Sequence, residues 1–170
     1  MSEEKPRHPF IAANILAEGV IKTLKPFAAT HDRTGDLLLQ AAGSLRRRKP
    51  TVKDLDLVMS PIDPLRFLEM ARETGAAIES HRVTWAFDLK AGPINVEVFL
   101  TEPDDFWSQL LMRTGPYDFN IKMRSTAKKL GYKLNRYGLW ERDTDRVAKF
   151  NNELKYFLAL GMRWREPEER

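Results

Sequence analysis

The chain has 170 residues, of which 42% are hydrophobic and 31% charged, and its net charge is +4. This length and composition predict one domain or two small ones with a packed core, and they argue against a mainly disordered chain. Because the sequence contains no cysteine, disulfides and thiolate metal sites are excluded.

The sequence shows neither a membrane span nor an export signal. No apolar run approaches the roughly 18 residues that a spanning helix needs. The N-terminal segment MSEEKPRHPF is polar, with acidic residues before basic ones, unlike a signal peptide. We therefore expect a protein that is not secreted, makes no membrane contact and is cytoplasmic, in the interior of a bacterium or of a phage or viral host.

The first hundred residues predict strands flanked by helices, as in an α+β or α/β module. A helix is expected over 9–28, and its apolar residues Ile11, Ile15, Val20 and Leu24 lie roughly on one side. The other expected elements are strands over 36–44, 54–59, 76–92 and 93–101 and a helix over 61–75.

After Thr101 the pattern changes, and we expect a domain boundary there, with domains over 1–100 and 101–170. The second domain is expected to contain helices over 102–115, 116–131 and 145–161 and a hairpin over 132–142 that turns near 136–138.

Two aspartates alternate with leucines in the strand DLDLVM. Side chains on a strand alternate between its faces, so Asp54 and Asp56 point the same way, with Cα atoms about 7 Å apart. If the later strand NVEVFL pairs beside it, Glu97 becomes a third carboxylate at the same place. Such a set can hold two magnesium ions for phosphoryl or nucleotidyl transfer. A lone D-x-D is more often an ordinary strand, so the prediction depends on its surroundings.

A Gly-Ser pair and a basic run precede these aspartates. A glycine at a strand end lets the backbone approach a ligand, and the N–H groups and the Ser44 hydroxyl can then bind phosphate oxygens. The run from Arg46 to Lys49 adds donors for a triphosphate. Gly-Ser, basic run, D-x-D and a later acidic strand, in this order, predict a nucleotidyltransferase site.

A one-signed basic stretch runs from Phe119 to Trp140 and contains no acidic residue. In a helix beginning near Pro116, an apolar side is expected from Phe119, Met123, Ala127 and Leu130. A separate polar stripe is expected from Asn120, Arg124 and Lys128. We interpret the stripe as a nucleic-acid contact, and a solvated helix face is the alternative.

The sequence resembles the DNA polymerase X family, the DNA polymerase beta-like enzymes, in a minimal form with only a palm and a thumb. The likeness covers nearly the whole chain and rests on the segments GSLRRRKPTVKDLDLV, VEVFL, RTGPYDFNIKMR, KLNRYGLW and WREPEER. It implies an α+β fold, in which a nucleotidyltransferase-type palm (a mixed sheet with helices) is followed by a small thumb of helices and a β-hairpin.

The resemblance also implies roles for single residues. Two Mg²⁺ ions, or Mn²⁺ in their place, would be bound by Asp54, Asp56 and Glu97, which are also the catalytic residues. The incoming dNTP would be contacted by Gly43, Ser44, Arg47, Thr114, Gly115 and Asn120. Gapped or primer–template DNA would be contacted by Arg124, Lys128, Lys129, Lys133 and Arg136, and Arg7 is a further candidate for phosphate contact.

The implied function is a DNA-directed DNA polymerase that fills short gaps in DNA repair and acts as a monomer. The sequence departs from the family pattern in several respects, and two other functions stay open. Glu97 replaces an aspartate, Met112 and Arg113 stand where aromatic residues are usual, and we expect no lyase activity because no lyase domain precedes the palm. The alternatives are a template-independent or non-DNA nucleotidyltransferase, and a DNA-binding module with weakened catalysis.

Overall fold

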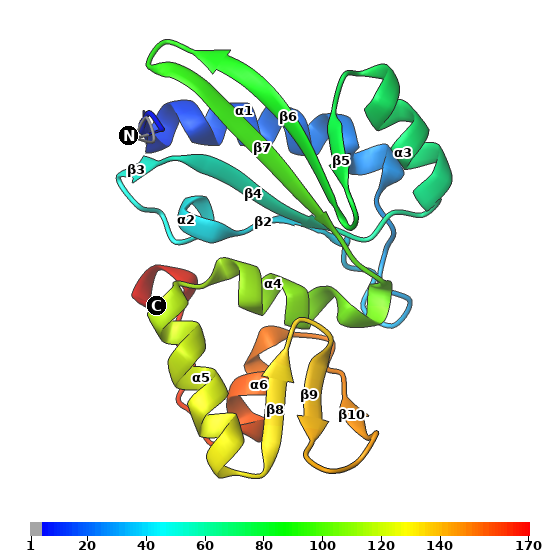
Figure 1. Cartoon of the computed structure of the whole chain (residues 1–170), viewed down its shortest axis with the longest axis vertical. Coiled ribbons are helices and arrows are strands. Elements are labelled where there is room, and N and C mark those ends of the chain that lie inside the picture. Colours follow the sequence, from blue (N-terminus) through cyan, green and yellow to red (C-terminus); the bar gives the residue numbers. More distant parts are fainter. Residues whose placement is uncertain (1–4) are drawn as a thin grey trace.

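A computed structural model describes residues 5–170 of the chain, which form two parts, one above the other in Figure 1. The segment considered as an export signal begins in residues 1–4, which lie outside the described residues. The N-terminal part, here called the palm, contains a five-stranded sheet in the order β2-β4-β7-β6-β5. Its strands are β2 (Leu39–Ala41), β4 (Asp54–Met59), β5 (Ala77–Glu79), β6 (Arg82–Leu89) and β7 (Gly92–Leu100).

The sheet is mixed, because β4 and β7 run parallel whereas the other neighbouring pairs are antiparallel. Strand β4 alternates as the sequence predicts. Leu55 and Leu57 are fully buried on one face, and Asp54 and Asp56 lie on the other. The prediction of an α+β palm with a mixed sheet is confirmed.

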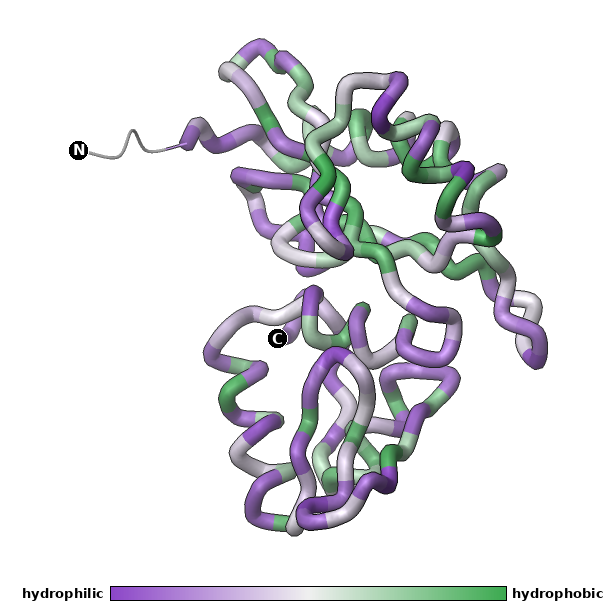
Figure 2. Tube along the Cα trace, turned by 45° about the vertical axis from the view of Figure 1, so that its right-hand side comes forward, coloured by the Kyte–Doolittle hydropathy of each residue, from purple (hydrophilic) through white to green (hydrophobic). Residues whose placement is uncertain are grey.

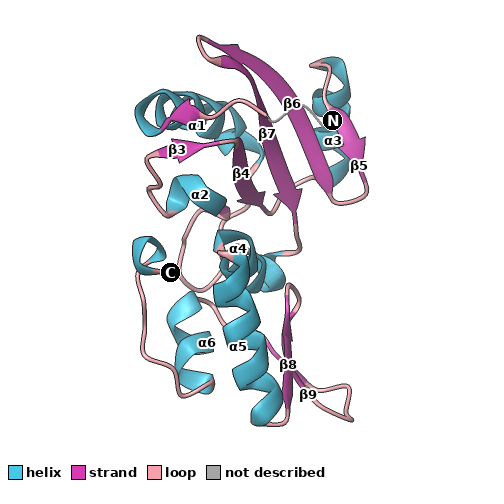
Figure 3. Cartoon of the chain, turned by 60° about the vertical axis from the view of Figure 1, so that its left-hand side comes forward, coloured by secondary structure: helices cyan, strands magenta, loops and turns pink. Residues whose placement is uncertain are grey.

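Helices cover the leucine side of this sheet. The helices α1 (Phe10–Leu24) and α3 (Pro64–Glu73) pack against it. Figure 3 shows both helices behind the strands and the second part of the molecule below the ends of β4 and β7. The short helix α2 (Gly43–Arg46) follows β2 at the edge. The remaining palm elements are the paired strands β1 (His8–Pro9) and β3 (Thr51–Val52) and the 3-10 turn η1 (Lys25–Phe27).

Helix α1 buries a different face from the one its large apolar residues indicate. Ile11 and Ile15 are 73% and 65% exposed, whereas Ala13 and Ala17 are buried against the sheet. Small side chains let the helix backbone approach the strands closely, so close packing selects the alanine face. Of the four apolar residues expected on one side of the helix, Val20 and Leu24 pack in the core, whereas Ile11 and Ile15 do not.

The C-terminal part, here called the thumb, begins with the 3-10 turn η2 (Pro103–Asp105). It continues through α4 (Phe106–Thr114) and α5 (Tyr117–Lys129) to a three-stranded sheet. The strands are β8 (Tyr132–Asn135), β9 (Gly138–Glu141) and β10 (Val147–Ala148), and the chain ends through α6 (Glu153–Ala159) and the 3-10 turn η3 (Pro167–Glu169). None of the helices in residues 5–170 is long and apolar enough to cross a membrane.

The last helix is shorter than the sequence indicates. A helix was expected over 145–161, but Val147 and Ala148 form β10, which pairs with Trp140 and Leu139 of β9. The helix begins only after Asn152, whose side chain accepts a hydrogen bond from the backbone N–H of Lys155.

The palm and the thumb each have a hydrophobic core, and a third cluster joins them. In Figure 2 the most hydrophobic stretches of the palm follow its central strands. The joining cluster packs Phe106 and Leu110 of α4 against Leu38, Ala42 and Val58 of the palm. Because α4 shares a core with the sheet, the thumb is fixed to the same side of the palm as the aspartates.

Candidate active site

The three acidic residues predicted from the sequence lie on two paired strands. In the parallel register of β4 and β7, Asp54 stands beside Asn95 and Asp56 stands beside Glu97. Paired residues of neighbouring strands point to the same face, so all three carboxylates emerge on the side that faces the thumb. They line one cavity of about 770 Å³ between palm and thumb.

Basic side chains stand next to these carboxylates. Lys5 forms an ion pair with Asp54 at 2.9 Å, and Arg82 forms one with Glu97 at 3.3 Å. Within residues 5–170, no three acidic or histidine side chains are arranged so that they could hold a metal ion as they stand. The described arrangement is therefore one in which protein cations balance part of the acidic charge.

The chemistry of the cavity nevertheless fits a bound cation. Burial, followed by the neighbouring charge of Glu97, raises the pKa of the Asp56 carboxyl to about 7, and Asp54 adds to the rise. Arg113 and Arg47 act in the opposite direction without cancelling it. Oxygen ligands that repel each other are what a hard divalent ion such as Mg²⁺ binds well.

The backbone at the start of α2 lies directly against Asp56. Gly43 has a φ of +56°, a region that favours glycine. A Cβ atom added there would lie 2.9 Å from Cγ of Asp56 and closer still to its Oδ2. The expected close approach of the backbone at Gly43 is therefore present, although what it approaches in this structure is a carboxylate of the protein.

Ser44 and Arg47, the predicted phosphate contacts, line the same cavity. The Arg47 guanidinium donates to the carbonyl oxygen of Thr114, and its Nε is buried without a partner. Burial lowers the pKa of Arg47, while Asp56 and Asp118 raise it. A buried, unpartnered N–H beside a cavity is suited to an anionic or polar ligand.

Asn120, predicted to contact the incoming nucleotide, is 9% exposed, so it is more buried than Arg124 and Lys128 of the same polar stripe. Its Nδ2 donates to the carbonyl oxygen of Met112 at 2.8 Å, and its Oδ1 is buried without a partner. Asn120 lines the cavity together with Gly115. Its position fits a contact with a ligand in the cavity better than a contact with distant DNA.

The other predicted DNA contacts lie on the thumb surface. Arg124, Lys128 and Lys129 are exposed on α5, and Lys133 is exposed on β8. Leu130, expected on the apolar side, follows the end of α5 and is 50% exposed. The apolar side of the helix therefore consists of Phe119, Met123 and Ala127.

Arg136 lies apart from that basic surface. It sits in the turn between β8 and β9, where its guanidinium contacts the imidazole of His81 in the palm and the hydroxyl of Tyr137. In this structure Arg136 therefore joins thumb to palm.

Sequence reasoning gave no binding role to two arginines beside the carboxylates. Arg113 lines the cavity, where its guanidinium stacks 3.6 Å from the centre of the Phe99 ring. Burial lowers the pKa of Arg113, and the charge of Asp56 acts against this shift. Arg82 was missed because the hairpin register brings it to Glu97 from another strand. The alternation of side chains along β6 and β7, once the two strands are paired as a hairpin, would have placed Arg82 on the same face as Glu97. Lys53 and Tyr117 also line the cavity and had no predicted role, whereas Lys49 of the basic run and Arg7, a further candidate for phosphate contact, line it as well.

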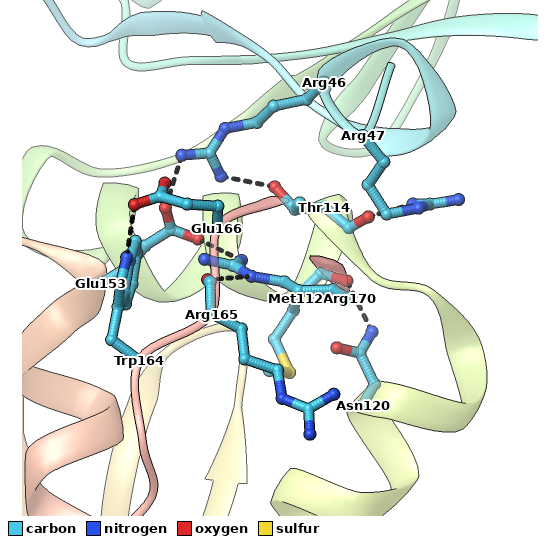
Figure 4. Close-up of polar contacts among 10 residues, drawn as sticks. All are labelled: Arg46, Arg47, Met112, Thr114, Asn120, Glu153, Trp164, Arg165, Glu166 and Arg170. Carbon is cyan, nitrogen blue, oxygen red and sulfur yellow. Dashed lines mark hydrogen bonds and ion pairs between the residues drawn. The ribbon is translucent and has the colours of Figure 1, made fainter. Parts of the chain in front are cut away.

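A buried polar network connects palm to thumb beside the cavity (Figure 4). Arg46 donates to the hydroxyl of Thr114 at 2.6 Å and forms an ion pair with Glu153. The second oxygen of Glu153 accepts from Arg170 at 2.9 Å, and both of these side chains are almost completely buried. Within the basic run, Arg46 therefore binds residues of the thumb, whereas Arg47 lines the cavity.

The comparisons with known proteins point to one family. Residues 109–170 match the family model described as DNA polymerase beta thumb. The chain is 33% identical over 136 residues to the DNA polymerase/3'-5' exonuclease PolX of Bacillus subtilis, which covers 76% of this chain. It is 27% identical over 139 residues to the repair DNA polymerase X of African swine fever virus, which covers 76% of this chain and 79% of the viral protein.

The chain is similar to DNA polymerases of the X family. A solved structure of Leishmania infantum polymerase beta in a ternary complex superposes with a TM-score of 0.74. The match covers 96% of this chain and 76% of that one, and at 22% identity it supports the fold. The chain spans only 23% of the length of the Bacillus subtilis relative.

Proposed function

We propose that this chain is a polymerase of the X family, which transfers a nucleotide from a dNTP to the 3′-hydroxyl of a DNA primer, directed by a template, at short gaps during DNA repair. The observation that carries the proposal is the pairing of Asp56 with Glu97 across β4 and β7. These carboxylates share their cavity with Ser44, Arg47 and Asn120, so acidic ligands, phosphate donors and an amide meet in one place.

The acidic residues Asp54, Asp56 and Glu97 would hold the divalent ions of the reaction. When bound, two Mg²⁺ ions neutralise the negative charge that builds up on the transferred phosphate and the leaving pyrophosphate. Burial and the neighbouring charges of Glu97 and Asp54 raise the pKa of Asp56, and this supports the assignment because a bound cation stabilises the ionised carboxylate. Manganese, which also accepts carboxylate oxygens, is the alternative ion.

The other cavity residues bind and orient the nucleotide. The Ser44 hydroxyl and the Arg47 guanidinium donate to the β and γ phosphates, and the unpartnered Nε of Arg47 is one donor for them. Thr114 and Gly115 lie under the sugar, and the unpartnered Oδ1 of Asn120 accepts from the base edge. The 3′-oxygen then attacks the α phosphorus, pyrophosphate leaves, and Glu97 accepts the proton of the hydroxyl.

The exposed basic residues of the thumb bind the duplex next to the cavity. Arg124 lies one turn beyond Asn120 on α5, and Lys128 lies one turn further. This spacing favours contacts with successive phosphates of the template strand, with Lys129, Lys133 and Arg136 as additional contacts. We propose two domains, 1–100 and 101–170, acting as one monomer inside the cell.

Primer extension on a duplex with a one-nucleotide gap tests the proposal. The wild type is expected to add one templated dNTP in Mg²⁺ or Mn²⁺, and Asp56→Ala is expected to add none. If the wild type matches Asp56→Ala in both metals, the proposal is wrong. Equal incorporation of all four nucleotides, whatever the template, would instead favour a template-independent transferase. Salt-sensitive DNA binding without turnover would favour a binding module.

A further inference from the structure

Glu97 has a charged partner on the neighbouring strand. Arg82 lies near the start of β6 and stands beside Phe99 of β7 in the antiparallel register, two residues beyond Glu97 on the same face. From this diagonal position its Nη1 reaches Oε2 of Glu97 at 3.3 Å. The Glu97 side chain is only 17% exposed, so the ion pair is partly shielded from solvent.

Arg82 is itself held from its other side. Its Nη2 forms an ion pair with Glu79, which lies across the tight turn between β5 and β6. Glu79 is 68% exposed and does not line the cavity, so its contact holds the guanidinium without taking part in the site. The two ion pairs use separate nitrogens, and together they fix the orientation of the guanidinium plane.

A glutamate at position 97 needs such support more than an aspartate would. Its side chain has one more rotatable bond, so an unrestrained carboxylate would occupy several positions over the cavity. Errors of about 1 Å in placing a reacting group can cost roughly a hundredfold in rate. Because Arg82 binds Oε2, it restricts these positions and leaves the second carboxylate oxygen for the cavity that Glu97 lines.

We propose that Arg82 is a positioning residue that orients the Glu97 carboxylate over the cavity, and that Glu97 and Arg82 work as a matched pair. The inference rests on the proposed nucleotidyl transfer, in which Glu97 acts directly. It follows that Glu97→Asp impairs this chain, since an aspartate at this position is one methylene too short for the ion pair with Arg82.

A double-mutant cycle of kcat on gapped DNA tests the pairing. Arg82→Ala is expected to lower kcat about 10- to 100-fold, with the KM for dNTP and the Kd for DNA changed by less than about twofold. Glu97→Asp is expected to lose a similar factor, and the double variant no more than the worse single variant. Arg82→Lys, which retains one donor, is expected to recover part of the loss. Arg72→Ala, which removes an exposed arginine on α3, is the control for net charge.

Two results of the cycle would overturn the proposal. If the losses from Arg82→Ala and Glu97→Asp multiply in the double variant, Arg82 does not act through Glu97. If Arg82→Ala weakens DNA binding in parallel with the rate, Arg82 is a phosphate contact.

A second measurement needs neither metal, DNA nor activity. The ¹H–¹⁵N resonances of the Arg82 guanidinium, assigned by their loss in Arg82→Lys, are expected to shift in Glu97→Gln. They are not expected to shift in Glu69→Gln, which changes an exposed residue of α3. No shift in Glu97→Gln would overturn the pairing even in a chain that incorporates nucleotides. If the Arg82 resonances shift in Glu97→Gln but the wild type incorporates no nucleotide in either metal, the pairing stands. The proposed function is then wrong, and with it any role of Arg82 in the reaction.

Discussion

The α-carbon of Gly43 lies so close to the carboxylate of Asp56 that no side chain fits between them. The first residue of α2 and a central residue of β4 are therefore in direct contact, and α2 also carries Ser44. The backbone expected to bind phosphate and the carboxylate expected to bind metal adjoin each other. A substitution at Gly43 should therefore move the Asp56 carboxylate, and a substitution at Asp56 should alter the packing against the backbone of α2.

The variant Gly43→Ala tests that contact. Its methyl group would force the Asp56 side chain to turn, and we expect nucleotide incorporation to fall by about a hundredfold or more. Stability should fall by about 1–2 kcal/mol, because φ at this position is positive. Gly75→Ala is the matched control, since Gly75 also has positive φ but has no atom within 4 Å of an added Cβ. A loss of activity in both variants would assign the effect to backbone strain alone.

The pKa of Asp56 makes the stability of the metal-free protein depend on pH. Its folded value of about 7 lies above the ordinary 3.8, so Asp56 contributes stability that is complete below pH 4 and is lost as pH rises through 7. The asparagine of the Asp56→Asn variant cannot ionise, so the variant should not lose this stability as pH rises. We expect thermal unfolding in EDTA to show the variant more stable than wild type at pH 8, on the order of 1–3 kcal/mol, with little difference near pH 4.

Two controls accompany the Asp56→Asn measurement. Asp88→Asn removes an exposed negative charge on β6 and corrects for net charge. Added Mg²⁺ should stabilise the wild type more than the variant, because the ion binds the ionised carboxylates of the folded state. Equal stability of wild type and Asp56→Asn at pH 8 in EDTA would contradict the repulsion described here.

The buried network at Glu153 should contribute strongly to stability. Glu153→Ala leaves the guanidinium of Arg170 buried without its anion and removes the partner of Arg46. Loss of one member of a buried ion pair costs about 3–5 kcal/mol, which urea denaturation would measure. Glu168→Ala breaks the exposed ion pair with Arg48 and should cost about 0–1 kcal/mol. Similar losses in the two variants would show that solvent reaches the Glu153 network.

Thumb lysines are expected to act on DNA affinity more than on chemistry. Lys128→Ala and Lys129→Ala remove exposed charges from the last turn of α5. Each should weaken binding to gapped DNA about equally for all sequences and reduce the slope of log K against log salt by about 1. Lys22→Ala, on α1 of the palm, should leave that slope unchanged. An unchanged slope in the thumb variants would place the duplex elsewhere.

Arg124 is expected to behave differently from the lysines. It lies between Asn120 and Lys128 on α5, and its Nη2 is 3.8 Å from Sδ of Met112, a residue of the cavity. Arg124→Ala should reduce the rate of templated insertion more than it reduces DNA affinity. Gel-shift titration and single-turnover incorporation on the same gapped duplex would separate the two effects. An unchanged rate and nucleotide selection would show that Arg124 does not face the template.

Much of the palm follows from local pattern. The alternation of β4 gives the faces of Asp54 and Leu55 without further information, and the alternation of β7 does the same for Glu97. That the strand of Glu97 pairs beside β4 was an assumption from the sequence, and the register confirms the pairing and shows that it is parallel.

The errors come from contacts between distant segments. Val147 and Ala148 lie in a stretch that reads as helix, but pairing with β9 makes them a strand. The burial of Asn120 depends on how α5 packs against α4, which the repeat of polar residues along α5 does not reveal. Arg82 reaches Glu97 from β6 and lies outside the segments that carry the family resemblance, and Arg113 lines the cavity from α4 although its segment assigns it no role.

The side chain of Arg170 lies among aromatic rings next to the cavity but does not line it. Its guanidinium lies 6.0 Å from the ring centre of Phe119, 5.2 Å from that of Phe157 and 5.0 Å from that of Trp164. Phe119 immediately precedes Asn120, so the aromatic stack supports the turn of α5 that forms one wall of the cavity. A substitution at position 170 could therefore present in a kinetic screen as a defect in nucleotide selection, although this residue does not line the cavity.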